Sequence, residues 1–132
     1  MSTLPLAGRT LGAADGSFLL AEWTAGPGGH DPPRTIDPLH VHFEDDEAWY
    51  VLEGTLRFRL GDDEVDAGAG AAVFAPRGVA HTFWNPSQEP ARYLLVMTAN
   101  IYALIEELHA TGVLDRVGMQ RVFENHASEL LE

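Results

Sequence analysis

Residues 38–54 read PLHVHFEDDEAWYVLEG, and residues 70–85 read GAAVFAPRGVAHTFWN. These two stretches hold three histidines and one glutamate within a fixed frame of glycines and prolines: His40, His42, Glu47 and His81. Imidazole nitrogens and carboxylate oxygens are donors with which proteins bind divalent transition metals. The sequence therefore predicts a metalloprotein with these four side chains as the ligands.

The spacing of the first three ligands predicts two β-strands joined by a turn. His40 and His42 are two residues apart, so on a strand they project from one face about 6.6 Å apart and can bind one ion. Glu47 lies five residues beyond His42, an odd offset that would place it on the opposite face of a straight strand. The residues from Phe43 to Asp46 are expected to form the turn, because acidic residues are rare in strands and Asp favours turns.

The fourth ligand, His81, falls on a later expected strand, Ala80 to Trp84, after a turn at Pro76 to Gly78. The alternation of a strand places Trp49 on the face of the glutamate ligand and Phe83 on the face of His81. There the two aromatic side chains would line an apolar pocket suited to a flat or aromatic substrate. The alternative is that both belong to the hydrophobic core.

The two stretches resemble the two conserved motifs of the cupin superfamily, and the resemblance covers Pro38 to Asn85. It implies a small antiparallel jelly-roll β-barrel with the metal inside, in an octahedral site with one or two open coordination positions. The ligands of that site would be His40, His42, His81 and Glu47. One position departs from the pattern, since Arg34 stands where the first cupin motif usually has a glycine. The sequence around Glu47–Gly54 and Pro76–His81 is similar to that of small quercetin-dioxygenase-like bacterial cupins.

Outside these stretches the sequence indicates an all-β body followed by helices. Further strands are expected at residues 18–23, 55–60, 64–67, 73–75 and 92–98, and the proline- and glycine-rich segment 25–38 is expected to be a loop. After Thr98 the apolar period changes from two to about 3.6 residues. One helix is expected from Asn100, as N-cap, to Gly112. A second helix is expected over residues that include Met119, Val122, Phe123, His126 and Leu130.

Together with the resemblance to cupins, this pattern predicts a single cupin domain over residues 1–132, with the barrel at about 10–98 and a helical tail at about 100–131. The tail carries Glu124, Glu129 and Glu132 against Arg116 and Arg121, which disfavours a DNA-binding helix pair. The helices are expected to pack over a barrel face or a dimer interface. We therefore expect a homodimer.

The composition limits the partners and the location. The 132 residues include 20 acidic residues, 8 arginines and neither lysine nor cysteine, which gives a formal net charge of -12. This charge opposes binding to a nucleic-acid backbone, and no apolar run approaches the ~20 residues of a membrane span. The lack of cysteine excludes disulfides and suits a reducing compartment, and the first ten residues do not resemble a signal peptide. We expect a cytoplasmic protein that binds a small molecule and neither nucleic acid nor membrane.

The resemblance leaves the reaction open. The leading hypothesis is a metal-dependent dioxygenase acting on a small chelating or aromatic substrate, with one divalent transition metal ion per chain: Fe, Mn, Ni, Zn or Cu. Glu47 would be either the fourth ligand or a base that moves between metal and substrate. The alternatives are a non-redox isomerase or cyclase, in which the ion is only a Lewis acid, and a non-catalytic cupin that binds a small molecule. The sequence places no other acid or base near the metal, and it does not decide whether Tyr50, Tyr93 or His30 reaches the pocket.

Overall fold

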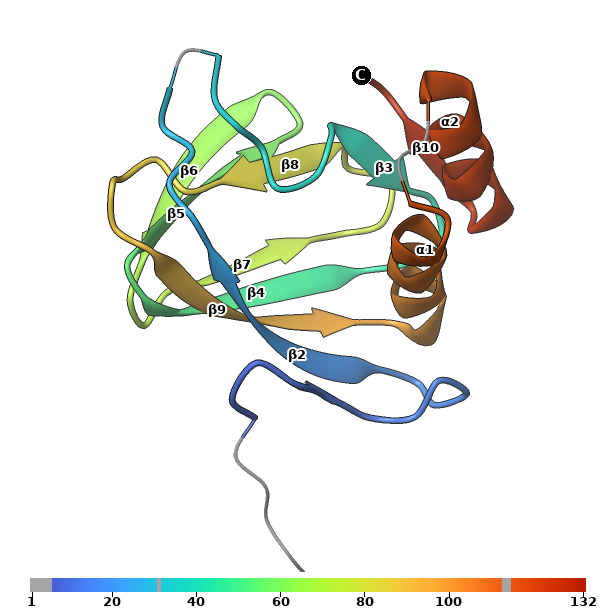
Figure 1. Ribbon diagram of the computed structural model, residues 1–132, viewed down its shortest axis with the longest axis horizontal. Helices are drawn as coiled ribbons and strands as arrows, with labels where there is room; N and C mark the ends of the chain where they lie inside the picture. The colour runs from blue at the N-terminus through green and yellow to red at the C-terminus, as the bar shows by residue number, and fades with distance from the viewer. Residues whose placement is uncertain (1–5, 31, 113–114) are drawn as a thin grey trace, which may run out of the picture.

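Two five-stranded antiparallel sheets pack face to face and form the body of the protein (Figure 1). The computed structural model describes residues 6–30, 32–112 and 115–132. One sheet has the strand order β1-β2-β9-β4-β7, and the other has the order β10-β3-β8-β5-β6. This arrangement confirms the expected jelly-roll β-barrel with helices after it. The strands are β1 (Thr10–Leu11), β2 (Leu19–Ala25), β3 (His40–His42), β4 (Glu47–Glu53), β5 (Thr55–Leu60), β6 (Asp63–Gly68), β7 (Ala72–Ala75), β8 (His81–Trp84), β9 (Ala91–Met97) and β10 (Ser128–Leu130), and the helices are α1 (Ala99–Ala110) and α2 (Arg116–Asn125).

The alternation of β4 follows the sequence pattern. Glu47, Trp49 and Val51 are buried, whereas Tyr50 is exposed on the outer face of the sheet. The chain then turns at Gly54 and crosses to β5 of the other sheet. Glycine is needed there because its φ is +79° and an added Cβ would lie 2.8 Å from the carbonyl oxygen of Pro90. The strand therefore presents one complete face, with Glu47 at its end, to the inside of the barrel.

Three aromatic rings fill the space between the sheets beside the predicted ligands. The rings of Phe58 and Phe83 stack at 5.2 Å between centroids, and Trp49 meets Phe58 edge-on at 5.1 Å. The ring of Trp49 also lies 5.5 Å from that of His81. Phe58 and Phe83 are cross-strand partners of β5 and β8, so this contact holds the strand of His81 in register.

We predict that Trp49→Ala destabilises the protein by about 3–5 kcal/mol, because it leaves a large cavity in a close-packed core. Trp49→Phe should cost much less, since the indole Nε1 is buried without a hydrogen-bond partner among the described residues and phenylalanine loses no such bond. Chemical denaturation of the metal-free variants measures both effects. A Trp49→Ala variant as stable as the parent protein would show that this ring is not part of the core.

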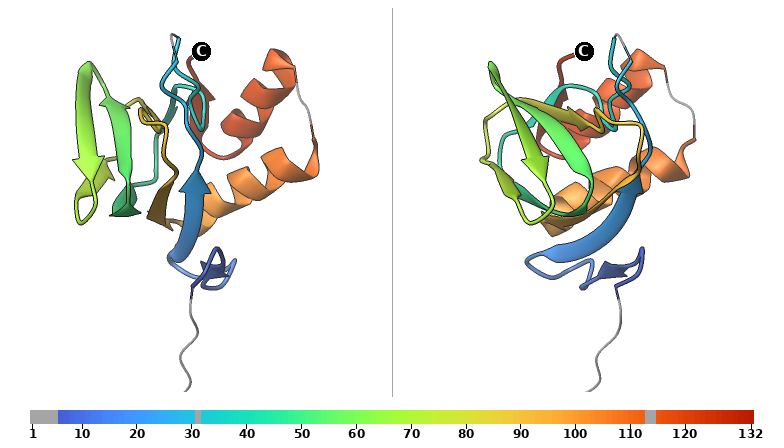
Figure 2. Two further views of the ribbon diagram at one scale, coloured as in Figure 1. Left: turned by 60° about the vertical axis from the view of Figure 1, so that its left-hand side comes forward. Right: turned by 90° about the vertical axis from the view of Figure 1, so that its left-hand side faces the viewer.

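The helical tail covers one end of the barrel, as both views in Figure 2 show. Helix α1 begins after Thr98, whose hydroxyl oxygen accepts a hydrogen bond from the backbone N–H of Ile101 at 3.2 Å. The prediction of Asn100 as the N-cap is therefore wrong, because the Asn100 side chain instead donates to the carboxylate of Asp45 at 2.7 Å. The helix ends before Gly112, whose φ of +74° supplies the expected left-handed stop.

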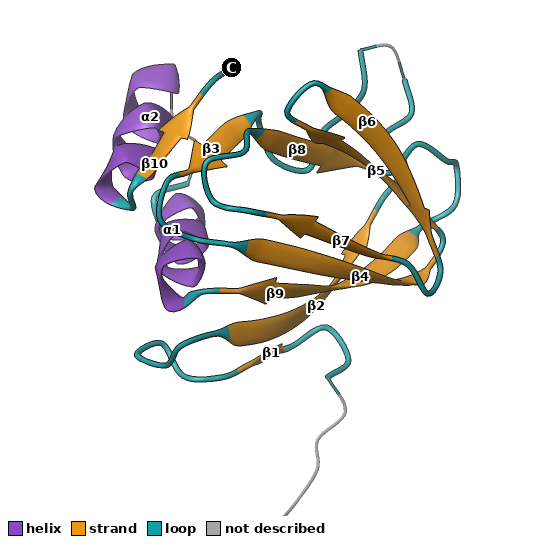
Figure 3. Cartoon of the chain, turned by 180° about the vertical axis from the view of Figure 1, so that it is seen from behind, coloured by secondary structure: helices purple, strands orange, loops and turns teal. Residues whose placement is uncertain are grey.

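The second helix is shorter than the sequence predicts. It ends at Asn125, His126 is its C-cap, and Ala127 takes a left-handed φ of 53°. The chain then pairs with β3 as strand β10, which lies beside β3 in Figure 3. A helix that includes Leu130 is therefore wrong, although Leu130 is buried in the same cluster as Phe123 of α2, which explains the misleading period. Among the described residues, no helix has the length and apolar character needed to cross a membrane.

Candidate metal centre

The four predicted ligands meet between the two sheets. Strands β3 and β8 of one sheet bring His40, His42 and His81, and β4 of the other sheet brings Glu47. His40 and His81 are direct cross-strand partners. The four side chains are 2% to 5% exposed, and they offer ligand atoms that all lie within 4.8 Å of one another. The structure thus brings together all the residues that the sequence assigned to the metal.

The turn between His42 and Glu47 makes this convergence possible. It is tied to the turn before His81 by an ion pair between Asp46 and Arg77 at 3.1 Å. The backbone N–H of Gly78 donates to the carbonyl oxygen of His42 at 2.7 Å. Gly78 has a φ of +83°, a conformation that glycine adopts without strain. The two ligand-bearing turns are therefore fixed to each other.

The orientation of the rings fits a cation. The Nδ1 atoms lie on the outer side of the cluster. Nδ1 of His40 contacts the carbonyl oxygen of Pro38 at 2.7 Å, Nδ1 of His81 contacts that of Val79 at 3.1 Å, and Nδ1 of His42 contacts Oγ of Ser128 at 2.7 Å. The Nε2 atoms face inward, where the Nε2 atoms of His40 and His42 lie 3.1 Å apart. The Oε1 atom of Glu47 lies 3.0 Å from Nε2 of His81 and 3.5 Å from Nε2 of His42. Three inward nitrogen lone pairs and a carboxylate form a donor set that suits a divalent transition ion.

Burial and mutual charge set the protonation of the cluster. Burial, together with the neighbouring His81 and His42, lowers the pKa of His40 to about 3. Burial raises the pKa of Glu47, but its hydrogen bonds with His42 and His81 outweigh burial and hold that pKa at about 2. Burial likewise lowers the pKa of His81, and the hydrogen bond and charge of Glu47 reverse this to a net rise. The carboxylate is therefore ionised, and the most basic of these groups is His81.

We predict that metal affinity falls as the pH is lowered, beginning above the ordinary histidine pKa of 6.5. His81 must lose its proton to bind a metal, and its raised pKa makes protons compete at a higher pH than they would for an ordinary histidine. His40 adds little to this competition until the pH approaches about 3. Titrations with Zn²⁺ over a series of pH values measure the effect. An affinity that does not change between about pH 8 and pH 5 would contradict the assignment of histidine ligands.

A cavity of about 450 Å³ opens from the cluster toward the helices. Residues of the barrel that line it include Trp23, Phe83, Tyr93 and Leu95, and residues of the tail include Ile101, Leu104, Ile105, Leu108, Met119 and Phe123. The described lining contains no arginine or lysine. The cavity is therefore an apolar chamber with His40, His42 and Glu47 in its wall.

The aromatic residues considered from the sequence fall on different sides of this chamber. Phe83 and Tyr93 line it, and burial raises the pKa of Tyr93. Trp49 is not among the lining residues and packs in the core beside His81. Tyr50 is 42% exposed and His30 is also exposed, and neither lines the chamber. The sequence alone could not separate Trp49 from Phe83, because both lie on inward faces.

Sequence reasoning missed Asp37. This residue lines the chamber, and its Oδ2 atom lies 4.0 Å from Nε2 of His40. The hydroxyl of Thr82 donates to the backbone oxygen of Asp37 at 2.6 Å, which fixes the loop against β8. Burial raises the pKa of Asp37 to about 7. Its odd offset from His40 would place it on the opposite face of a continuous strand, but it precedes β3 on a loop that turns it inward.

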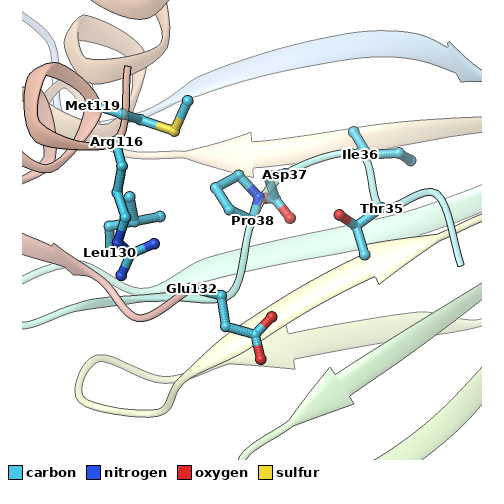
Figure 4. A pocket seen from close by; sticks show the side chains of 8 residues that line it. All are labelled: Thr35, Ile36, Asp37, Pro38, Arg116, Met119, Leu130 and Glu132. Carbon is cyan, nitrogen blue, oxygen red and sulfur yellow. The ribbon is translucent and has the colours of Figure 1, made fainter. Parts of the chain in front are cut away.

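A second hollow of about 400 Å³ adjoins the chamber (Figure 4). It lies between the loop of Ile36, Asp37 and Pro38, the start of α2 and the C-terminal strand, with Arg116 and Glu132 in its lining. The loop residues and Met119 also line the chamber. Asp37 thus belongs to a wall shared by both hollows.

Comparison with known proteins identifies the family. The sequence model of the Cupin domain matches residues 24–97. The chain is 33% identical to TT1209 from Thermus thermophilus (62% of this chain and 72% of that chain, TM-score 0.54). It is 32% identical to the polyketide cyclase RemF from Streptomyces resistomycificus, over 63% of this chain and 55% of the cyclase, with a TM-score of 0.52. It is 28% identical to a sugar phosphate isomerase of the cupin superfamily from Silicibacter pomeroyi, over 63% of this chain and 51% of the isomerase, with a TM-score of 0.55.

The chain therefore spans only about half the length of the cyclase and the isomerase. No curated protein matches it. The matched region holds all four clustered ligands, and the two-sheet barrel is the fold that the matched structures share. The chain belongs to the cupin superfamily.

Proposed function

We propose that this cupin is a metal-dependent enzyme that cyclises or isomerises a small, largely apolar substrate. One divalent transition metal ion would be held by His40, His42, Glu47 and His81. The observation that carries the proposal is the apolar chamber, which has three of the four ligands, His40, His42 and Glu47, in its wall. Asp37 is the only carboxylate in its described lining besides Glu47. Such a chamber combines a cation, a proton-transfer group and space for a small molecule.

The residues divide the chemistry between them. When bound, the metal ion supplies Lewis acidity, which polarises a carbonyl or enol oxygen. Glu47 would be occupied as a ligand of this ion, because its Oε1 atom lies among the imidazoles of His42 and His81. We therefore assign proton transfer to Asp37, whose carboxylate faces the chamber beside His40 without belonging to the cluster. The apolar side chains of α1 and α2 would shield the substrate from water.

The lining also points to a class of substrate. The isomerase neighbour acts on a sugar phosphate, but the described lining of this chamber offers no arginine or lysine for a phosphate group. The cyclase neighbour acts on a polyketide, a class of apolar molecule with carbonyl groups that chelate a cation through two oxygens. We infer a neutral polyketide-like or other 1,3-dicarbonyl substrate for this cupin.

A dioxygenase of the quercetin-dioxygenase-like kind is the second candidate. Four protein ligands on a six-coordinate ion leave two positions, which suffice for a chelating substrate or for one substrate oxygen and O₂. Aromatic side chains such as Phe83 and Trp23 in the lining would suit a flat substrate. A third outcome is a cupin that only binds its ligand.

One experiment separates the three. The protein is loaded in turn with Zn²⁺, Fe²⁺ or Ni²⁺ and is given 1,3-dicarbonyl, catechol and flavonol compounds while oxygen uptake and products are followed. We expect a product without oxygen uptake, with Zn²⁺ sufficient, and a loss of about 10²- to 10⁴-fold in turnover for Asp37→Asn at unchanged metal content. Oxygen uptake with Fe²⁺ or Ni²⁺ would establish the dioxygenase instead. Stabilisation that grows with ligand concentration, with no product from any compound, would establish a binding protein.

A further inference from the structure

The three histidines of the cluster are not supported in the same way. Nδ1 of His40 and Nδ1 of His81 each contact a carbonyl oxygen two residues earlier in the chain, those of Pro38 and Val79. Nδ1 of His42 instead lies 2.7 Å from the hydroxyl oxygen of Ser128, a residue 86 positions away on β10. Ser128 is buried, with 3% of its surface exposed. His42 therefore depends on a side chain from the C-terminal strand.

The protons of this contact can be assigned by chemistry. When Nε2 of His42 binds a cation it carries no proton, so Nδ1 carries the single proton of the neutral ring and needs an acceptor. The hydroxyl of Ser128 donates its own proton to the carbonyl oxygen of His126 at 3.0 Å. The Ser128 oxygen is then free to accept from Nδ1. The relay thus runs from His42 to Ser128 to the His126 carbonyl.

The protein holds Ser128 firmly in this place. Ser128 is the direct cross-strand partner of His42, and backbone hydrogen bonds from Phe43 N to Ala127 O and from Leu131 N to Leu39 O, both 2.9 Å, flank the pair. The His126 carbonyl also accepts from the side chain of Asn100 at 2.8 Å.

Asn100 in turn donates to Asp45, in the turn that joins the strands of His42 and Glu47. A connected set of hydrogen bonds therefore links the ligand turn, α1 and β10.

We propose that Ser128 is a positioning residue that fixes the Nδ1–H tautomer of His42, so that the C-terminal strand completes the metal centre. Ser128 lies outside the region 24–97 that matches the family, so the assignment concerns this chain's own tail. It rests on the metal-binding part of the function proposed above. The side chain does not touch the metal and acts only through His42.

Four variants test this role by Zn²⁺ affinity, with the melting temperature of each metal-free protein as a measure of folding. Ser128→Val replaces the hydroxyl with a methyl group and adds a second methyl group, and Ser128→Ala removes the hydroxyl. Ser128→Thr keeps the hydroxyl and has almost the size of valine. Glu129→Ala is the control on the same strand, because Glu129 is exposed. We expect Ser128→Val and Ser128→Ala to bind Zn²⁺ about 10- to 100-fold more weakly, and Ser128→Thr and Glu129→Ala to bind like the parent protein.

Equal losses for Ser128→Thr and Ser128→Val, or no loss for Ser128→Val and Ser128→Ala, would overturn the proposal. A parent protein that binds no Zn²⁺ would overturn the metal-binding function as well, so the two failures are distinguishable. If the residue 128 variants do not fold, long-range ¹H–¹⁵N spectra of the Zn²⁺-loaded parent decide the question. The proposal requires His42 to bind through Nε2 with a proton on Nδ1, and binding through Nδ1 would refute it.

Discussion

Replacing His40, His42 or His81 by alanine is expected to remove most of the bound metal. Each imidazole directs its Nε2 atom into the same buried space, with the nearest ligand atoms 3.0 to 3.5 Å apart. Loss of one ligand should therefore cost more than the ~10- to 100-fold in affinity that follows from loss of an outer hydrogen-bond partner. Metal analysis of the purified variants measures the effect. Glu47→Gln should weaken metal binding less, because the amide oxygen can still bind the metal although it lacks the negative charge.

The control for this series is His109→Ala. His109 lines the same chamber but is not part of the four-residue cluster, so its removal should leave the metal content unchanged. Full metal content in His81→Ala would show that the third imidazole is wrongly assigned. A loss of metal in His109→Ala equal to that in the ligand variants would show that the experiment measures general damage to the chamber.

Removal of all residues after Thr98 is expected to leave a barrel that aggregates and binds metal poorly. The deletion uncovers the chamber, removes core residues such as Ile101 and Phe123, and leaves β3 without its partner β10. Each buried side chain of this kind contributes about 1.5–3 kcal/mol, and an open strand edge promotes association. The ring of His40 also loses its contact with Phe123, at 5.2 Å between centroids.

Size-exclusion chromatography and melting temperature measure this outcome. The matched control removes only Glu132, which follows β10 and is exposed, and it should behave like the full chain. A truncated protein that stays monomeric with an unchanged melting temperature would contradict a structural role for the tail. Size-exclusion chromatography also tests the homodimer predicted from the sequence. If the full chain elutes as a dimer and the truncated chain does not, the dimer interface lies on the tail.

Local periodicity explains why the ligands could be predicted. The His40–His42 spacing, the acidic turn and the separate strand of Glu47 are properties of short segments, and the structure follows them. Phe83 and Trp49 share this local pattern, yet only Phe83 lines the chamber. The difference arises because the depth of a residue within the barrel depends on how the two sheets pack, which no single strand determines.

The residues that escaped prediction depend on contacts between distant segments. Asp37 reaches the chamber because the loop before β3 docks on Thr82, 45 residues away. Ser128 meets His42 only because the chain reverses at Ala127 and pairs with β3. Asn100 was a plausible helix cap by residue type, but Thr98 takes that role and Asn100 bonds to Asp45. The capping choice was thus decided by a partner 55 residues away.

The division of the ligands between the two sheets has a mechanical consequence. Three histidines belong to one sheet and Glu47 to the other, so an ion held by all four would act as a removable cross-link across the barrel. Removal of the ion by a chelator should then destabilise the packing of both sheets rather than a single loop. Amide hydrogen exchange should therefore increase together in β3, β4 and β8. Resistance to unfolding would report how fully the site is loaded, which allows candidate metals to be ranked before any substrate is known.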